Sequence, residues 1–323
     1  MNAPLSMGER ASALAAHGMV RDALKLLERG ALAGDPDACF TIGLWCLAGT
    51  HVHCDLTAAR NWFGKAGQYG HPLGRTVHTA FLANGTGGAR QWAQAIGQLR
   101  VDARQDAAAA RQLALIGQMV LDADGTPAPI SAPHAYSQSP GISLFKGFLT
   151  RAECDYLIDT AEPLFRPADI VDPGSGRAMR NPIRTSDSAV FPLANENPAI
   201  HAINRRIAAA SATDVGQGEP LQILRYAPGQ QYRSHLDALP GTGNQRLFTF
   251  LIYLNTDYEG GQTNFVEAGL RIRGQRGDAI LFRNALPDGT PDPMTRHAGL
   301  PVQRGTKYLA SRWIRQQPLS LTR

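Results

Sequence analysis

The residues best suited to chemistry lie at the end of segment 221–237, which reads LQILRYAPGQQYRSHLD. His235 and Asp237 are separated by one residue, and alternate side chains of a β-strand project from the same face. An imidazole and a carboxylate can therefore reach one point in space. With a later histidine they would form the two-histidine, one-carboxylate set that holds Fe(II) and leaves coordination positions open. The tripeptide alone is more often an ordinary polar strand end, so its context decides.

The sequence around this segment predicts a β-rich second half of the chain. Short runs of β-branched, aromatic and aliphatic residues recur with Gly, Pro and Asn between them, at 221–226, 246–254, 262–265, 270–272, 279–282 and 308–314. Many short strands separated by turn residues are typical of a sandwich or barrel. Further upstream, Thr150 and Glu153 have the spacing of a capping box, which predicts that a helix begins there after a short apolar run.

Six segments carry a resemblance to a known family. They are FLTRAECDYLI, RTSDSAVF, LQILRYAPGQQYRSHLD, RLFTFLIYLNTDYEGGQTNF, RGDAILFRN and RHAGLPVQRGTKYLASRWIR. In their order and spacing, residues 140–315 resemble the catalytic domain of the prolyl 4-hydroxylase branch of Fe(II)/2-oxoglutarate-dependent dioxygenases. The resemblance implies a double-stranded β-helix, or jelly roll, with supporting helices. It also implies Fe(II), the cosubstrate 2-oxoglutarate and O2, and it admits ascorbate as a reductant.

Carried over position by position, the resemblance assigns the iron ligands and the main cosubstrate contact. The iron ligands would be His235, Asp237 and His297. Two neutral imidazoles and one carboxylate suit Fe(II), so the chemistry of these residues agrees with the assignment. Lys307 stands ten residues after His297, where the family pairs a lysine with the distal carboxylate of 2-oxoglutarate. A desolvated ammonium group suits such a charge-assisted bond.

The resemblance also assigns secondary contacts around this centre. Tyr226 and Thr249 match positions that hydrogen-bond 2-oxoglutarate. The residues that match the substrate side of the site are Arg184, Ser186, Tyr232 and Trp313. For these last residues the alternative role is packing or a structural ion pair.

The implied enzyme is a hydroxylase that inserts oxygen into an aliphatic C–H and releases succinate and CO2. Trp313 and Tyr232 suit a proline or proline-like ring, either in a peptide or as a free imino acid. Several arginine residues between positions 166 and 184 would equally suit the carboxylate of another free amino acid. An alternative of another class is a binding protein in which a repeat scaffold is joined to an inactive oxygenase domain. The complete set of iron ligands and Lys307 argues against it.

The first part of the chain is alanine-rich, has helical periodicity and repeats itself. A shift of 36 residues pairs Ala23 with Ala59, Leu27 with Phe63, and Pro36 with Pro72. Each unit reads as helix, glycine-containing turn and helix, which resembles Sel1-like repeats, relatives of the tetratricopeptide repeat. Such an array could bind a protein partner or form a homodimer. An equally good interpretation is a helical cap that stabilises the neighbouring domain.

The predicted fold class is therefore α+β, with a jelly-roll catalytic domain preceded by an α-helical repeat domain. We expect the repeat domain at 1–121, a linker rich in Pro, Gly, Ser and Asp at 122–140, and the dioxygenase domain at 141–323.

Composition excludes several other classes of function. The chain has 323 residues, a hydrophobic content of 43% and a formal net charge of +5. Lysine and arginine are dispersed, which does not indicate a nucleic-acid surface. No apolar run approaches the roughly 18 residues of a membrane helix, so no membrane association is expected. Residues 1–22 lack the pattern of a secretory signal. Four cysteines without CxxC pairing fit a cytoplasmic protein.

Overall fold

The computed structural model describes residues 5–171, 178–180, 183–239, 241 and 243–319. The described chain forms two compact units. The first, here called the helical unit, contains the described residues up to Thr126 together with Leu193–Ala202. The second, here called the sheet unit, contains those of Pro127–Pro192 and Ile203–Leu319. None of the described helices is both long and apolar enough to cross a membrane.

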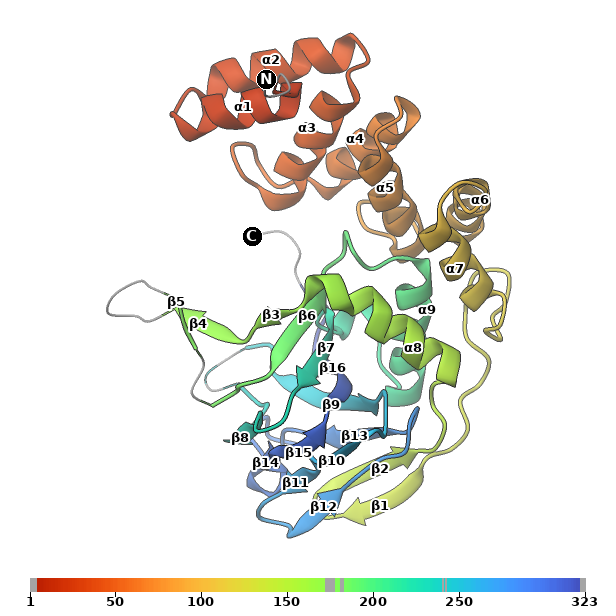
Figure 1. Ribbon diagram of the computed structural model, residues 1–323, viewed down its shortest axis with the longest axis vertical. Helices are drawn as coiled ribbons and strands as arrows, with labels where there is room; N and C mark the ends of the chain where they lie inside the picture. The colour runs from red at the N-terminus through yellow and green to blue at the C-terminus, as the bar shows by residue number, and fades with distance from the viewer. Residues whose placement is uncertain (1–4, 172–177, 181–182, 240, 242, 320–323) are drawn as a thin grey trace. The chain divides into compact units, whose positions relative to one another are not determined.

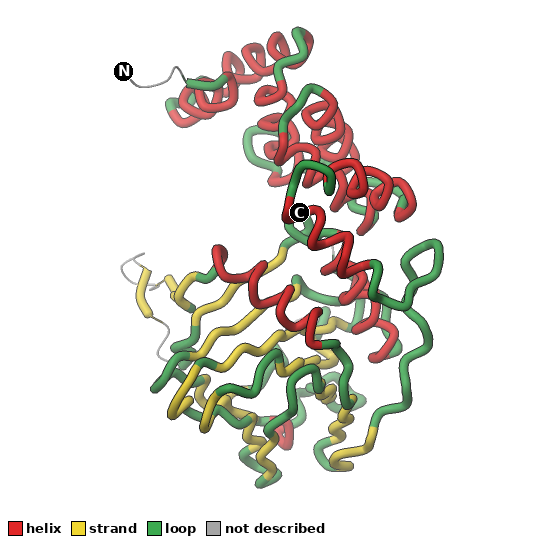
Figure 2. Tube along the Cα trace, turned by 45° about the vertical axis from the view of Figure 1, so that its right-hand side comes forward, coloured by secondary structure: helices red, strands yellow, loops and turns green. Residues whose placement is uncertain are grey.

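Successive α-helices form the part of the helical unit that precedes Thr126, as Figure 2 shows in red. They are α1 Met7–Ala16, α2 Val20–Leu32, α3 Pro36–Ala48, α4 Leu56–Gln68, α5 Pro72–Asn84, α6 Trp92–Asp102 and α7 Ala107–Ile116. Adding 36 to the bounds of α2 gives the bounds of α4, and the same shift converts α3 into α5. The predicted internal repeat therefore agrees with the helix boundaries.

The equivalent helices begin and end by the same chemistry. Pro36 and Pro72 occupy the first positions of α3 and α5, where a missing N–H costs nothing. Gly49 and Gly85 end these helices with φ of 65° and 80°, a left-handed conformation that glycine adopts without strain. In the core, Phe63 packs on the Cβ-free surface of Gly43, where an added Cβ would lie 2.8 Å from the ring. A small residue thus lets α3 and α4 approach closely.

The sheet unit is built around a large antiparallel sheet (Figure 1). Its eight strands, in order across the sheet, are β1 His134–Gln138, β2 Gly141–Phe145, β13 Ala279–Arg283, β9 Arg246–Tyr253, β16 Lys307–Arg315, β7 Leu221–Tyr226, β6 Asp187–Phe191 and β3 Arg166–Pro167. A four-stranded sheet contains β12 Leu270–Ile272, β11 Thr263–Phe265, β14 His297–Gly299 and β8 Tyr232–His235.

Smaller elements complete the described fold. The two-stranded sheets pair β10 Tyr258–Gly260 with β15 Val302–Gly305, and β4 Asp169–Val171 with β5 Ala178–Arg180. The remaining α-helices are α8 Arg151–Ala161 and α9 Pro198–Ser211, and the short 3-10 helices are Glu162–Leu164, Val215–Gln217 and Pro293–Thr295.

The core of the sheet unit lies between the eight-stranded and four-stranded sheets. One buried cluster joins Leu251 and Phe282 of the large sheet to Phe265 and Ile272 of the small one. The rings of Phe265 and Phe282 meet edge to face at 5.0 Å, a favourable geometry for aromatic pairs. Two antiparallel sheets enclosing a shared core form a jelly roll, so the predicted α+β class and catalytic fold are confirmed.

The helix predicted from the capping box is present as α8. The Thr150 hydroxyl accepts a hydrogen bond from the Glu153 amide, and the Glu153 carboxylate accepts one from the Thr150 amide. The same carboxylate forms a 2.6 Å ion pair with Arg206. Glu153 is only 2% exposed, so this ion pair replaces most of the carboxylate's lost hydration.

The structure differs from the predicted linker at 122–140. His134–Gln138 forms β1, which pairs with β2 at the edge of the large sheet. Its side chains are mostly exposed, so this strand lacks the apolar alternation that marks a half-buried strand. An edge strand is held by backbone hydrogen bonds to one neighbour, which composition does not reveal.

Candidate metal centre and cosubstrate pocket

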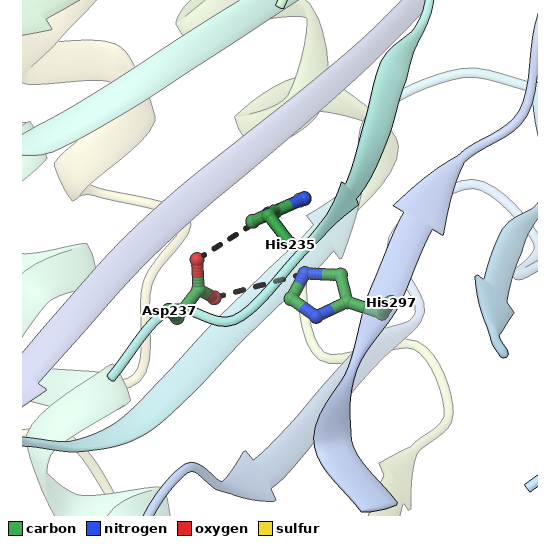
Figure 3. Close-up of side chains that lie close together, drawn as sticks. All are labelled: His235, Asp237 and His297. Carbon is green, nitrogen blue, oxygen red and sulfur yellow. Dashed lines mark ion pairs between the residues drawn. The ribbon is translucent and has the colours of Figure 1, made fainter. Parts of the chain in front are cut away.

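His235, Asp237 and His297 converge at one end of the four-stranded sheet. His235 ends β8 and His297 begins β14, and the two are direct partners in this antiparallel pair. Each oxygen of the Asp237 carboxylate faces one imidazole (Figure 3). Nε2 of His235 lies 3.5 Å from Oδ1, and Nε2 of His297 lies 3.7 Å from Oδ2. One ligand atom from each residue lies within 4.8 Å of the others, which suits a shared cation.

Backbone carbonyl groups orient both imidazole rings for metal binding. Nδ1 of His235 lies 2.7 Å from the carbonyl oxygen of Arg233, and Nδ1 of His297 lies 2.9 Å from that of Thr295. A carbonyl can only accept a hydrogen bond, so each Nδ1 carries the proton. Each Nε2 therefore presents a lone pair toward the centre, the usual arrangement for a histidine ligand.

The protonation states also fit a divalent cation. Burial lowers the pKa of His297 to about 4, so this imidazole is neutral near pH 7. Burial alone would raise the pKa of Asp237. The imidazoles of His297 and His235 and a hydrogen bond from Thr249 outweigh burial and hold that pKa well below its usual range. Two neutral imidazoles and one carboxylate are the donor set expected for a non-haem Fe(II) site.

Lys307, at the start of β16, supplies a buried cation to the pocket that the metal centre also lines. Its Nζ donates a 2.7 Å hydrogen bond to the Gly261 carbonyl and lies 5.4 and 5.7 Å from the ring centres of Tyr226 and Tyr253. Burial lowers the Lys307 pKa to about 7. Among the described residues that line this pocket, Asp237 is the only acidic one. A dicarboxylate ligand would therefore supply the missing counter-charge.

Two residues on β9 lie beside the metal centre and Lys307. Thr249 does not line the pocket, and its hydroxyl lies 2.6 Å from Asp237 Oδ2. Its contact with 2-oxoglutarate stays a prediction. Tyr253, which sequence reasoning missed, lies near Lys307, and its hydroxyl donates to Thr263 in the pocket wall. Tyr226 lines the pocket as expected.

Three of the predicted substrate residues reach the same pocket. They are Arg184, Tyr232 and Trp313. The Arg184 guanidinium lies 5.5 Å from the centre of the Tyr232 ring and donates hydrogen bonds to Ser186 and Gln222 at 3.1 and 3.2 Å. Ser186 is 1% exposed and accepts the hydrogen bond from Arg184. Their contact with a substrate stays a prediction.

Arg246 is a further residue beside the substrate side of the pocket that sequence reasoning missed. Its guanidinium lies 3.5 Å from the centre of the Trp313 ring, a cation–π contact. Glu219 holds it through hydrogen bonds of 2.7 and 2.9 Å and also binds Arg315 at 2.6 Å. Arg246 follows a loop and opens β9, and an arginine at a strand start carries no distinctive signal in the sequence.

Comparisons with known proteins identify the class of protein. Residues 221–315 match the 2OG-Fe(II) oxygenase superfamily. Prolyl 4-hydroxylase 1 of Arabidopsis thaliana is 35% identical over 207 residues, which cover 58% of this chain and 73% of that protein. Probable prolyl 4-hydroxylase 10 of the same plant is 34% identical over 203 residues, covering 55% and 70%. The viral collagen prolyl hydroxylase of Paramecium Bursaria Chlorella virus-1, solved with 2-oxoglutarate, is 31% identical, with coverage of 54% and 95% and a TM-score of 0.44.

The chain belongs to the 2OG-Fe(II) oxygenase superfamily. It is a 2-oxoglutarate-dependent dioxygenase, and its cofactors are Fe(II), 2-oxoglutarate and O2. Prolyl 4-hydroxylases are among its relatives, which confirms the resemblance drawn from the six sequence segments. The residues present fit Fe(II) and 2-oxoglutarate, because the triad offers the donors that Fe(II) prefers and Lys307 offers a buried amine that can pair with a carboxylate.

Proposed function

We propose that this protein hydroxylates proline or a proline-like ring, in a peptide or as a free imino acid. The observation that carries the proposal is that one pocket joins the His235, Asp237 and His297 triad to the buried Lys307 and to the aromatic ring of Trp313. Identity of 35% to a prolyl 4-hydroxylase supports the choice of ring. Arginines in segment 166–184 would also suit the carboxylate of another free amino acid as substrate. The structure describes only part of that segment.

Each part of the pocket has a distinct task in this proposal. His235, Asp237 and His297 hold the iron through their inward-facing donor atoms. Lys307 binds the distal carboxylate of 2-oxoglutarate, a bond that strengthens in a site that excludes water. When bound, Fe(II) with 2-oxoglutarate and O2 would supply the oxidising chemistry that converts a C–H into a C–OH, with release of succinate and CO2. Trp313 orients the substrate ring, since rate depends on close placement of the reacting atoms.

The test is product analysis with purified protein, Fe(II), 2-oxoglutarate and a substrate panel. The panel contains proline, pipecolate, other free amino acids and proline-containing peptides, and the readouts are succinate and the added mass of one oxygen atom. We expect product with a proline ring, and none from His235→Ala. The matched control is His134→Ala, because His134 is an exposed histidine of β1.

The outcomes separate the alternatives. Product from a free amino acid without a proline ring would overturn the choice of ring and support the biosynthetic alternative. Protein that holds iron yet forms no succinate with any member of the panel would support the repeat-scaffold binding protein with an inactive oxygenase domain.

We also propose that the helical unit is a Sel1- or tetratricopeptide-like array that binds a protein partner or a second copy of the chain. The 36-residue correspondence of α2 with α4 and of α3 with α5 supports this type of repeat. A cytoplasmic location is part of the proposal, supported by the free thiols of all four cysteines. Light scattering of the purified chain distinguishes a homodimer from a monomer, and cell fractionation tests the location.

A further inference from the structure

A chain of buried side chains connects the carboxylate of the metal centre to the large sheet. Asn284 Nδ2 lies 2.9 Å from Thr249 Oγ1, and Thr249 Oγ1 lies 2.6 Å from Asp237 Oδ2. We call these three residues the carboxylate-capping relay. Thr249 and Asn284 are both 0% exposed, so water does not compete for their hydrogen bonds.

The direction of the protons in this relay follows from the number of donors. A carboxylate that binds a metal ion can only accept hydrogen bonds through its oxygens. Thr249 has one hydroxyl proton, and the 2.6 Å contact to Asp237 Oδ2 must use it. The Thr249 oxygen is then an acceptor toward Asn284, whose amide group must donate. The relay therefore has one consistent proton arrangement, running from Asn284 through Thr249 to Asp237.

Asn284 is fixed well enough to impose this arrangement. Its backbone amide donates a 2.8 Å hydrogen bond to the Leu247 carbonyl, and its own carbonyl accepts a 2.9 Å hydrogen bond from the Asp292 amide. The residue follows directly after β13, whose Phe282 is the register partner of Thr249. Both ends of the Asn284–Thr249 contact are thus anchored in the backbone of the large sheet.

We propose that Asn284 and Thr249 are positioning residues that cap Asp237 Oδ2 and leave Oδ1 as the only oxygen free to bind the metal. A carboxylate that bound through both oxygens would take a coordination position that 2-oxoglutarate or O2 needs. The relay thus keeps the Asp237 carboxylate a single-oxygen ligand. This inference rests on the iron centre of the proposed function and extends it to two residues with no contact to the metal.

The test measures metal and cosubstrate binding rather than turnover. Co(II) is titrated into the metal-free protein, followed by its visible spectrum, and 2-oxoglutarate is then titrated into the cobalt-loaded protein. We expect Thr249→Val to weaken Co(II) binding by about 10- to 100-fold, the usual effect of losing a partner that orients a metal ligand. The cobalt spectrum should change shape, and 2-oxoglutarate should bind more weakly as Oδ2 competes for its position.

Matched variants separate this role from general stability. Thr249→Ser keeps the hydroxyl and should restore both binding constants and the spectrum. Asn284→Leu removes the polar contacts of the Asn284 side chain with Thr249, keeps the Thr249 hydroxyl, and should give a smaller change in the same direction. Ser211→Ala also deletes a buried hydroxyl, one that bonds its own helix at Ile207, and should leave all three readouts unchanged.

The possible results lead to different conclusions. A wild-type protein that binds cobalt, with a folded Thr249→Val variant of equal affinity and spectrum, would overturn the capping role while leaving the proposed function intact. A wild-type protein that binds no cobalt would overturn the metal centre and the capping role together.

Discussion

Replacing Lys307 by methionine is expected to stabilise the fold while it destroys cosubstrate binding. The ammonium is 2% exposed, and burial lowers its pKa from 10.5 to about 7. At about 1.4 kcal/mol for each pH unit, this corresponds to roughly 5 kcal/mol against the charged form in the folded state. Lys307→Met also loses the hydrogen bond to the Gly261 carbonyl, and this loss lowers the free energy of unfolding by about 1 kcal/mol or more. A net gain of roughly 2 to 4 kcal/mol follows for Lys307→Met near pH 7.

The gain should depend on pH in a defined direction. Below pH 7 the Lys307 side chain is charged in both the folded and the unfolded protein, so the whole penalty is present. Between pH 7 and 10.5 the folded protein has released this proton and the unfolded protein has kept it. The free energy of unfolding of the wild type therefore rises with pH in this window, and the advantage of Lys307→Met shrinks.

Thermal unfolding at pH 6.5 and pH 9.5 checks this reasoning. We expect Lys307→Met to raise the melting temperature by roughly 5 to 10 °C at the lower pH and by much less at the higher pH. Binding of 2-oxoglutarate to the cobalt-loaded variant should be lost at both. Lys146→Met, at an exposed position, is the control and should change neither quantity. A variant less stable than the wild type at pH 6.5, or a gain independent of pH, would refute the argument.

Three other outcomes follow from the contacts. Binding of 2-oxoglutarate at pH 8 should take up about one proton, because it recharges Lys307, and calorimetry in buffers of different ionisation heat measures this uptake. Glu219→Gln loosens Arg246 and should raise KM for the prolyl substrate several-fold with KM for 2-oxoglutarate unchanged, as steady-state kinetics would show. Glu153→Gln leaves the Arg206 charge without its carboxylate and should cost about 3 kcal/mol in urea unfolding. An unchanged unfolding midpoint would contradict that ion-pair energy.

The sequence predicted best what depends on local spacing. The 36-residue shift predicts equivalent helices, because prolines, glycines and buried positions recur at fixed intervals. The Thr150 capping box marks the start of α8 for the same reason. His235 and Asp237 could be placed at one point from the two-residue period of a strand, and they do lie together.

Local spacing could not predict which side chains of β9 contact the metal centre inside the sheet unit. Thr249, Leu251 and Tyr253 alternate along β9, so sequence places them on one face. Across the β9–β16 pair, Thr249 is opposite Trp313 and Tyr253 is opposite Leu309, near the Lys307 end. Which of them meets the carboxylate of Asp237 depends on how the two sheets pack, and that is a long-range property.

The position of β16 has a consequence for how the protein is made. Lys307–Arg315 follows every other described strand along the chain, yet it lies between β7 and β9 inside the large sheet. During synthesis from the N-terminus, β7 and β9 therefore leave the ribosome with unpaired inner edges, and such edges readily join other strands. Helices of the repeat pack mainly against their neighbours in sequence, so they can fold before the rest of the chain has been synthesised. A nascent chain should thus carry a folded helical unit while its jelly roll still lacks the central strand.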